Sequence, residues 1–153
     1  MPWDPIWNGS RSGDAWLEYC NEHPAAKMMG LKAVDTDGQV MRFRLPHAPA
    51  MNPNGSVHGG MLAAALDTAL AQTAMTGMPD DGLPNTAGMN LQYLRPAMPP
   101  LDILVHVTRS GRQMVFARAE IFTKGDVLCA TADGTFAVVA PKHVALREDS
   151  DDV

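Results

Sequence analysis

Residues 52–70, with the sequence NPNGSVHGGMLAAALDTAL, decide the fold of this chain. A polar, glycine-bearing turn opens a segment that is apolar on nearly every side, which predicts a helix from about Val57 to Met75 enclosed by other structure. One carboxylate, Asp67, lies in its middle. Because a buried carboxylate without a partner is costly, Asp67 is a candidate for chemistry rather than for folding.

The segments on either side of this helix have the alternation of β-strands. Two precede it, at 31–36 and 39–45, and four follow it, at 85–94, 101–109, 113–123 and 127–139. The turn Asp37-Gly38 connects the first two strands, and the turns at 110–112 and 124–126 connect the last three. Short connections of this kind indicate antiparallel pairing.

The pattern therefore predicts an α+β fold in which a curved antiparallel sheet of about six strands wraps one long central helix. A single sheet covers only one side of such a helix. The other side, together with the free sheet edge, requires a second subunit, so we expect an obligate dimer.

The ends of the chain differ in composition from its centre. Residues 1–12 are rich in Pro, Trp, Gly and Ser and are expected to be irregular. A short helix is predicted from Ser12 or Asp14 to about His23, where Pro24 would end it. The main domain is placed at 13–142, and the acidic tail at 143–153 is expected to be disordered.

Bulk properties exclude several classes of protein. The 153 residues fit one domain with a sizeable core. A net charge of −5 argues against a general nucleic-acid binder. Cys20 and Cys129 lack metal-site spacing and indicate reduced thiols of a cytoplasmic protein. Without a signal peptide or a long apolar run, no membrane partner is expected.

The start of the central helix can polarise an oxygen atom. Its first N–H groups have no partner within the helix, and Gly59 and Gly60 allow close approach to the backbone. Asp67 has no basic residue three or four positions away. Alternatively, the glycines serve only close packing, and Asp67 is a surface carboxylate or one satisfied by hydroxyl groups.

Several of these motifs resemble the hot-dog-fold acyl-CoA thioesterases of the phenylacetate-degradation (PaaI-like) branch. They are His58-Gly59-Gly60, Leu66-Asp67-Thr68-Ala69, Met89-Asn90-Leu91 and Tyr93-Leu94-Arg95-Pro96-Ala97, and the similarity runs from about residue 30 to 140. The resemblance implies a cytoplasmic hydrolase that converts acyl-CoA to a carboxylic acid and CoA. It also implies a homotetramer built from dimers, with active sites at the dimer interface and neither metal nor cofactor, since CoA is part of the substrate.

The resemblance also implies roles for single residues. The N–H of Gly59 or Gly60 would polarise the thioester carbonyl, and Asp67 would act as general base or nucleophile. Asn52 would position the water or the carbonyl, and the Thr86 hydroxyl would orient the water. As alternatives, Asn52 serves turn chemistry and Thr86 is an ordinary strand residue. His58 either bonds near the thioester or braces the loop.

The spacing of these residues makes a separate prediction. Gly60 and Asp67 are seven residues apart, so they share one helix face but lie about 10 Å apart along the axis. One carbonyl group cannot contact both within a single chain. Each site is therefore expected to combine the helix start of one subunit with Asp67 of its partner, which gives two sites in an isologous dimer.

The substrate itself is defined only in part. Arg95 and Arg112 are the candidates for binding the CoA phosphates. Met28, Met29, the helix at 14–23 and residues 75–78 are the candidates for the acyl pocket, whose acyl group the sequence does not specify. Two other functions stay open, namely a non-catalytic acyl-CoA-binding or sensor protein, and a hot-dog hydratase or dehydratase that would use His58.

Overall fold

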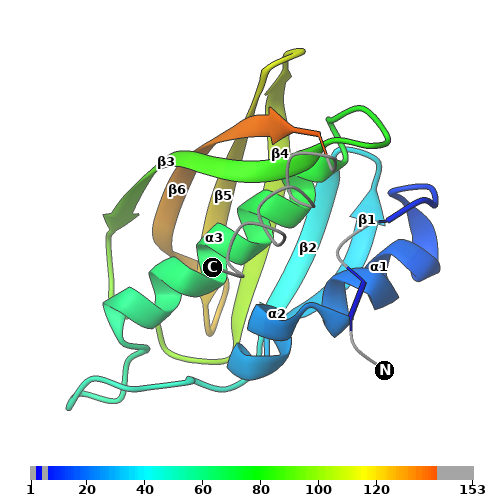
Figure 1. Ribbon diagram of the computed structural model, residues 1–153. Helices are drawn as coiled ribbons and strands as arrows, with labels where there is room; N and C mark the ends of the chain where they lie inside the picture. Colours follow the sequence, from blue (N-terminus) through cyan, green and yellow to red (C-terminus); the bar gives the residue numbers. More distant parts are fainter. Residues whose placement is uncertain (1–2, 5–6, 141–153) are drawn as a thin grey trace, which may run out of the picture.

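One long helix lies against a single curved sheet (Figure 1). The computed structural model describes residues 3–4 and 7–140. Its elements are α1 (Gly13–Glu22), α2 (Pro24–Met29), β1 (Lys32–Asp37), β2 (Val40–Leu45), α3 (Gly59–Met75), β3 (Leu83–Tyr93), β4 (Leu101–Ser110), β5 (Met114–Thr123) and β6 (Val127–Val139).

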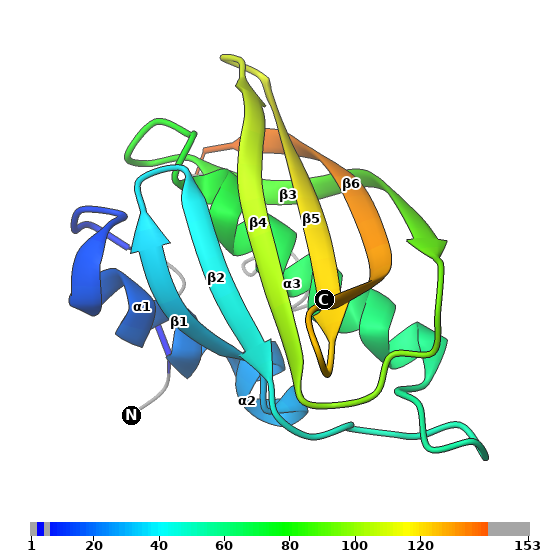
Figure 2. The same cartoon turned by 180° about the vertical axis from the view of Figure 1, so that it is seen from behind.

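The sheet has the strand order β1-β2-β4-β5-β6-β3, and every neighbouring pair is antiparallel. β3 precedes β4 in the chain but lies at the far edge, where it pairs only with β6. From behind, the strands pass in front of α3, so the helix occupies one face of the sheet (Figure 2). The predicted hot-dog architecture is therefore confirmed.

Side-chain alternation explains why the sheet closes on α3. In β2, Met41 and Phe43 are buried against the core, whereas Arg42 and Arg44 point outward. On β6, a Cβ atom at Gly134 would come within 2.7 Å of the Phe136 ring. Leu70 of α3 would lie 3.3 Å from the same atom, so a glycine suits this position, where the helix packs against β6.

The predicted first helix is confirmed, since α1 has Ser12 as its N-cap and ends at Glu22, just before Pro24. Pro24 then begins a second helix, α2, that was not predicted, because His23 accepts a hydrogen bond from the Ala25 N–H and proline suits the first helical position. The predicted start of the central helix is wrong. α3 begins at Gly59 rather than Val57, because the Val57 N–H donates to the Ala97 carbonyl and Val57 forms a bridge with Met51.

The predicted domain limits stay predictions. Residues 3–4 and 7–12 contain no helix or strand. The acidic tail at 143–153 lies outside the described residues.

Arg11 ties the N-terminal segment to the end of α3. Its guanidinium donates hydrogen bonds of 2.7–3.0 Å to the carbonyl oxygens of Met75, Pro79, Asp80 and Gly82. Met75 is the last residue of α3, where carbonyl groups lack partners within the helix. A positive charge there also interacts favourably with the negative end of the helix dipole.

We therefore expect Arg11→Ala to lower the free energy of unfolding by about 2 kcal/mol, because charge-assisted hydrogen bonds to several carbonyl groups are lost. Chemical denaturation at a fixed protein concentration measures this loss. Arg11→Lys is the matched control, because it keeps the positive charge but not the planar guanidinium with its several donors. Its free energy of unfolding should lie between those of wild type and Arg11→Ala. An Arg11→Ala protein as stable as wild type would contradict this role.

Candidate active site

The N-terminus of α3 opens into a cleft of about 500 Å³, here called the helix-start cleft. Glycine at the first two helical positions leaves the backbone uncovered on this side. The cleft is lined by the helix start, the loop before it and the segment after β3, including Asn52, Gly59, Gly60, Tyr93 and Arg95. Two candidate groups from the sequence, the glycine pair and Arg95, therefore lie together.

The two glycine amides differ in availability. The Gly60 N–H donates to Nδ1 of His58 at 3.0 Å, so the His58 side chain caps the helix. Within the described residues, the Gly59 N–H has no hydrogen-bond acceptor. Gly59 thus offers a free donor at the positive end of the helix dipole.

Asn52 holds the loop before the helix in shape. Its Nδ2 donates to the Ser56 hydroxyl at 3.1 Å and to the Val57 carbonyl at 3.4 Å, and its backbone N–H donates to the Ser56 carbonyl. These bonds are turn chemistry, although the residue also lines the helix-start cleft. A role of Asn52 toward a water or carbonyl stays a prediction.

Asp67 lies on the side of α3 that the sheet leaves uncovered. It is half-buried, and the exposed Thr86 hydroxyl donates to its Oδ1 at 2.8 Å. The pairing of β3 with β6 shifts register between Thr86 and Gly88. Such bulges re-aim side chains, and here the strand presents Thr86 to the helix. The structure thus brings two predicted site residues together.

A second cleft, here called the Asp67 cleft, has a volume of about 370 Å³. Its lining comes from α1, α2, α3, β3 and the N-terminal segment: Trp3, Tyr19, His23, Ala25, Asp67, Thr68, Ala71, Gln72, Met75, Leu83, Pro84 and Thr86. Gln72 is buried there and donates to the Cys20 carbonyl at 2.9 Å.

Burial shifts the titration of two groups in the Asp67 cleft. Desolvation lowers the pKa of His23 below its ordinary value of 6.5, so the ring is neutral at pH 7. Since its Nδ1 accepts from Ala25, the remaining proton is on Nε2. Desolvation, with smaller contributions from Cys20 and Asp4, raises the pKa of Tyr19 to about 12. The wall beside Asp67 is therefore uncharged at neutral pH.

The two clefts have no lining residue in common, although Gly59 and Asp67 belong to one helix. This agrees with the helical rise, which separates them by about 12 Å. Within one chain the free amide and the carboxylate thus face different cavities.

The other predicted binding residues are dispersed. Arg95 lines the helix-start cleft and donates to the Leu128 carbonyl at 2.9 Å. Arg112 lies in the β4–β5 turn, which is not part of that cleft. Met75 lines the Asp67 cleft, whereas Met29 is in the core and Met28 is largely exposed.

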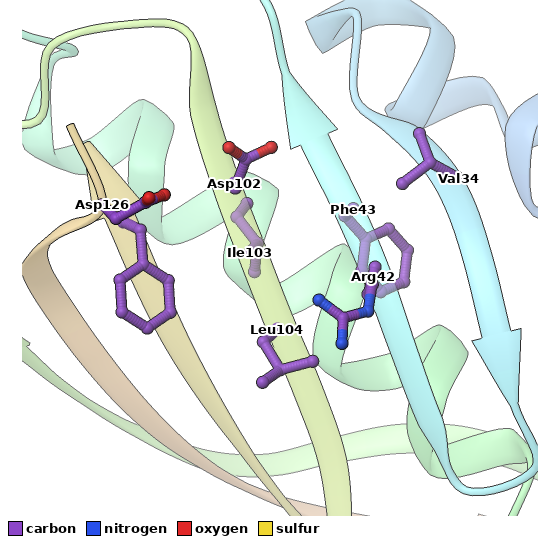
Figure 3. A pocket seen from close by; sticks show the side chains of 8 residues that line it. Val34, Arg42, Phe43, Asp102, Ile103, Leu104 and Asp126 are labelled. Carbon is purple, nitrogen blue, oxygen red and sulfur yellow. The ribbon is translucent and has the colours of Figure 1, made fainter. Parts of the chain in front are cut away.

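A further hollow of about 410 Å³ lies on the opposite face of the sheet (Figure 3). Strand side chains including Arg42, Asp102 and Leu104 line it. Two of its charged groups lie in exposed ion pairs within the sheet, Arg42 with Asp35 at 3.9 Å and Asp102 with Arg44 at 3.7 Å. The sheet separates this hollow from α3, so it does not join the site.

Within the part of the chain that the structure describes, no three His, Cys, Asp or Glu side chains are grouped to hold a metal ion. Among residues 3–4 and 7–140, no helix has both the length and the apolar character for crossing a membrane.

Sequence reasoning assigned no role to two residues that shape the site. The Tyr93 hydroxyl donates to the Gly59 carbonyl at 2.6 Å and so fixes the first turn of α3. Trp3 reaches the Asp67 cleft from the N-terminal segment. The tryptophan content of residues 1–12 was the available signal, but no periodicity showed where these rings pack.

Comparisons with known proteins agree with this geometry. The profile of the Thioesterase superfamily matches residues 54–130. A protein of Halobacterium salinarum that carries an esterase name is 29% identical over 140 residues, which cover 88% of this chain and 90% of that protein.

Two solved structures are similar as well. A phenylacetic acid degradation-related protein of Ralstonia eutropha JMP134 is 31% identical, with a TM-score of 0.68, covering 75% of this chain and 90% of that one. A Bacillus halodurans protein, solved with CoA, is 28% identical, with a TM-score of 0.67. The match covers 74% of this chain and 77% of that one.

Proposed function

Because the chain belongs to the thioesterase superfamily, we propose that it hydrolyses an acyl-CoA thioester at a site shared between two copies of the chain. The observation that carries this proposal is that α3 bears both the Asp67–Thr86 pair, on its uncovered side, and a free amide at Gly59, at its start, too far apart to act on one carbonyl within a single chain. The Bacillus halodurans relative with CoA supports CoA as the carrier of the acyl group.

Two surfaces support a homodimer. β3 is an eleven-residue edge strand paired on one side only, and exposed edges of this length favour pairing with another strand. The uncovered face of α3 carries small side chains, among them Ala63, Ala64 and Ala71. A second copy that continues the sheet through β3 would cover this face. Its own helix start could then approach Asp67.

In this arrangement the thioester carbonyl lies between the Asp67 carboxylate of one subunit and the Gly59 amide of the other. As water attacks the carbonyl carbon, Asp67 accepts its proton and the Gly59 N–H stabilises the oxyanion. The tetrahedral intermediate then expels the CoA thiolate, which takes the proton from Asp67. Alternatively, Asp67 attacks the carbonyl carbon directly, the C–S bond breaks and the CoA thiolate leaves; water then hydrolyses the resulting anhydride to the free acid and the Asp67 carboxylate. Thr86 holds the carboxylate in place on either route.

The polar groups of CoA fit the helix-start cleft, where Arg95 offers a positive charge to phosphate. Arg112 is a further candidate for phosphate binding. We also propose that two dimers associate into a tetramer, as the resemblance implies.

We expect purified wild-type protein to release CoA thiol from at least part of a panel of straight-chain, branched and aromatic acyl-CoAs. A thiol-reactive chromophore measures the release, with the free acid identified in parallel. Stoichiometric binding of acyl-CoA without thiol release would instead favour a sensor, and addition of water to an enoyl-CoA would favour a hydratase.

A further inference from the structure

We propose that Trp3, carried by the N-terminal arm (residues 3–4 and 7–12), forms part of the acyl-binding site and sets the size of the acyl group accepted. This inference rests on the proposed thioester hydrolysis. It adds a specificity-determining residue from a segment outside the matched superfamily region.

The two clefts beside α3 suit the two halves of an acyl-CoA differently. The helix-start cleft contains Arg95 and suits the phosphates. The Asp67 cleft contains no Lys or Arg side chain and has apolar walls such as Met75, Leu83 and Trp3. If the reacting carbonyl lies at Asp67, the acyl chain extends into this apolar cleft.

Trp3 is held firmly as one wall of the Asp67 cleft. Its indole N–H donates to the Tyr19 carbonyl at 3.3 Å. Its ring centre lies 5.3 Å from that of Tyr19 and 4.7 Å from that of His23, which it meets edge to face at 69°. These contacts are favourable aromatic geometries, so the wall is a packed surface.

Residues 7–12 of the arm pack outside the Asp67 cleft. The Trp7 ring centre lies 4.9 Å from Tyr19 and 5.9 Å from the buried Trp16. Arg11 then fastens the arm to the carbonyl groups at the end of α3. The Trp3 wall therefore depends on the contacts of Trp3 itself with Tyr19 and His23.

Trp3→Ala would replace a fixed indole by open space. We expect the ratio of kcat/KM for decanoyl-CoA to kcat/KM for butyryl-CoA to rise at least about tenfold, since even one methylene group in an apolar pocket discriminates about 10- to 200-fold. Trp3→Leu should shift the ratio in the same direction but less.

Trp7→Ala is the matched control. It removes an indole of the same size from the same arm, but Trp7 does not line the Asp67 cleft. We expect its chain-length ratio to equal that of wild type even if its stability falls. Circular dichroism and gel filtration establish that each variant is folded, and Trp3→Leu replaces Trp3→Ala if the latter is not.

The outcomes separate this inference from the function on which it rests. Wild-type protein that hydrolyses no acyl-CoA would overturn the proposed function. Active wild type with the same chain-length ratio in the folded Trp3 and Trp7 variants would overturn the role of Trp3 while leaving hydrolysis intact. A shift confined to the Trp3 variants supports both.

Discussion

Asp67→Asn is expected to lower kcat about a thousandfold, with the fold and the association of subunits unchanged. The amide has the same shape as the carboxylate and can still accept the hydrogen bond from Thr86. It can neither take a proton from water nor attack a carbonyl carbon. General-base catalysis contributes about 10²- to 10⁴-fold, which sets the expected size. Thiol release measures the loss, and gel filtration the association.

Asp133→Asn is the control for removing a carboxylate elsewhere. Asp133 is exposed and pairs with Arg118 at 3.0 Å on β5 and β6. Surface pairs of this kind contribute little to stability, so turnover should equal that of wild type. If Asp67→Asn retained full turnover, another group would have to activate the nucleophile.

Gly59→Pro should lower kcat/KM by about 10²- to 10³-fold, the usual effect of removing one oxyanion donor. Proline lacks the N–H that Gly59 leaves free, yet it is well tolerated at the first helical position. The preceding residue, His58, has ψ 131°, which a following proline accommodates. Gly59→Ala keeps the N–H, and its Cβ would meet Tyr93 at an ordinary 3.4 Å. It should therefore stay far more active.

Combining the two variants tests whether the site is shared between subunits. A heterodimer of one Asp67→Asn chain and one Gly59→Pro chain has one intact site and one with both defects, if each site uses both chains. Such heterodimers, purified through two different affinity tags, should show roughly half of wild-type activity although both homodimers are inactive. A heterodimer as inactive as its parents would place amide and acid in the same chain.

The sequence predicted the elements well where periodicity is strong. The alternation at 40–45 indicates a strand and the apolar run at 61–75 indicates a buried helix. The structure has a strand and a helix at these positions. The start of α3 was misplaced because Val57 and His58 lie between the loop that precedes the helix and the helix itself. A bridge to Met51 and a side-chain cap decide that boundary, and neither has a periodic signal.

The candidate site was predictable only as a set of residue types. The sequence indicated Asp67 and the glycine pair, and helical geometry alone separated them. It could not show that His58 occupies the Gly60 amide and leaves Gly59 free. It also could not place Thr86 against Asp67, because that contact depends on β3 crossing to the far edge of the sheet and on a bulge within it.

By itself, then, the sequence determined the strands, the long apolar helix and the position of its single acid, because these follow from local periodicity and helical rise. Tertiary structure alone decided the strand order, the two clefts and the packing of Trp3 and Arg11 against residues distant in the chain. The physical reason is that such contacts depend on the path of the backbone in space, which no local pattern of side chains specifies.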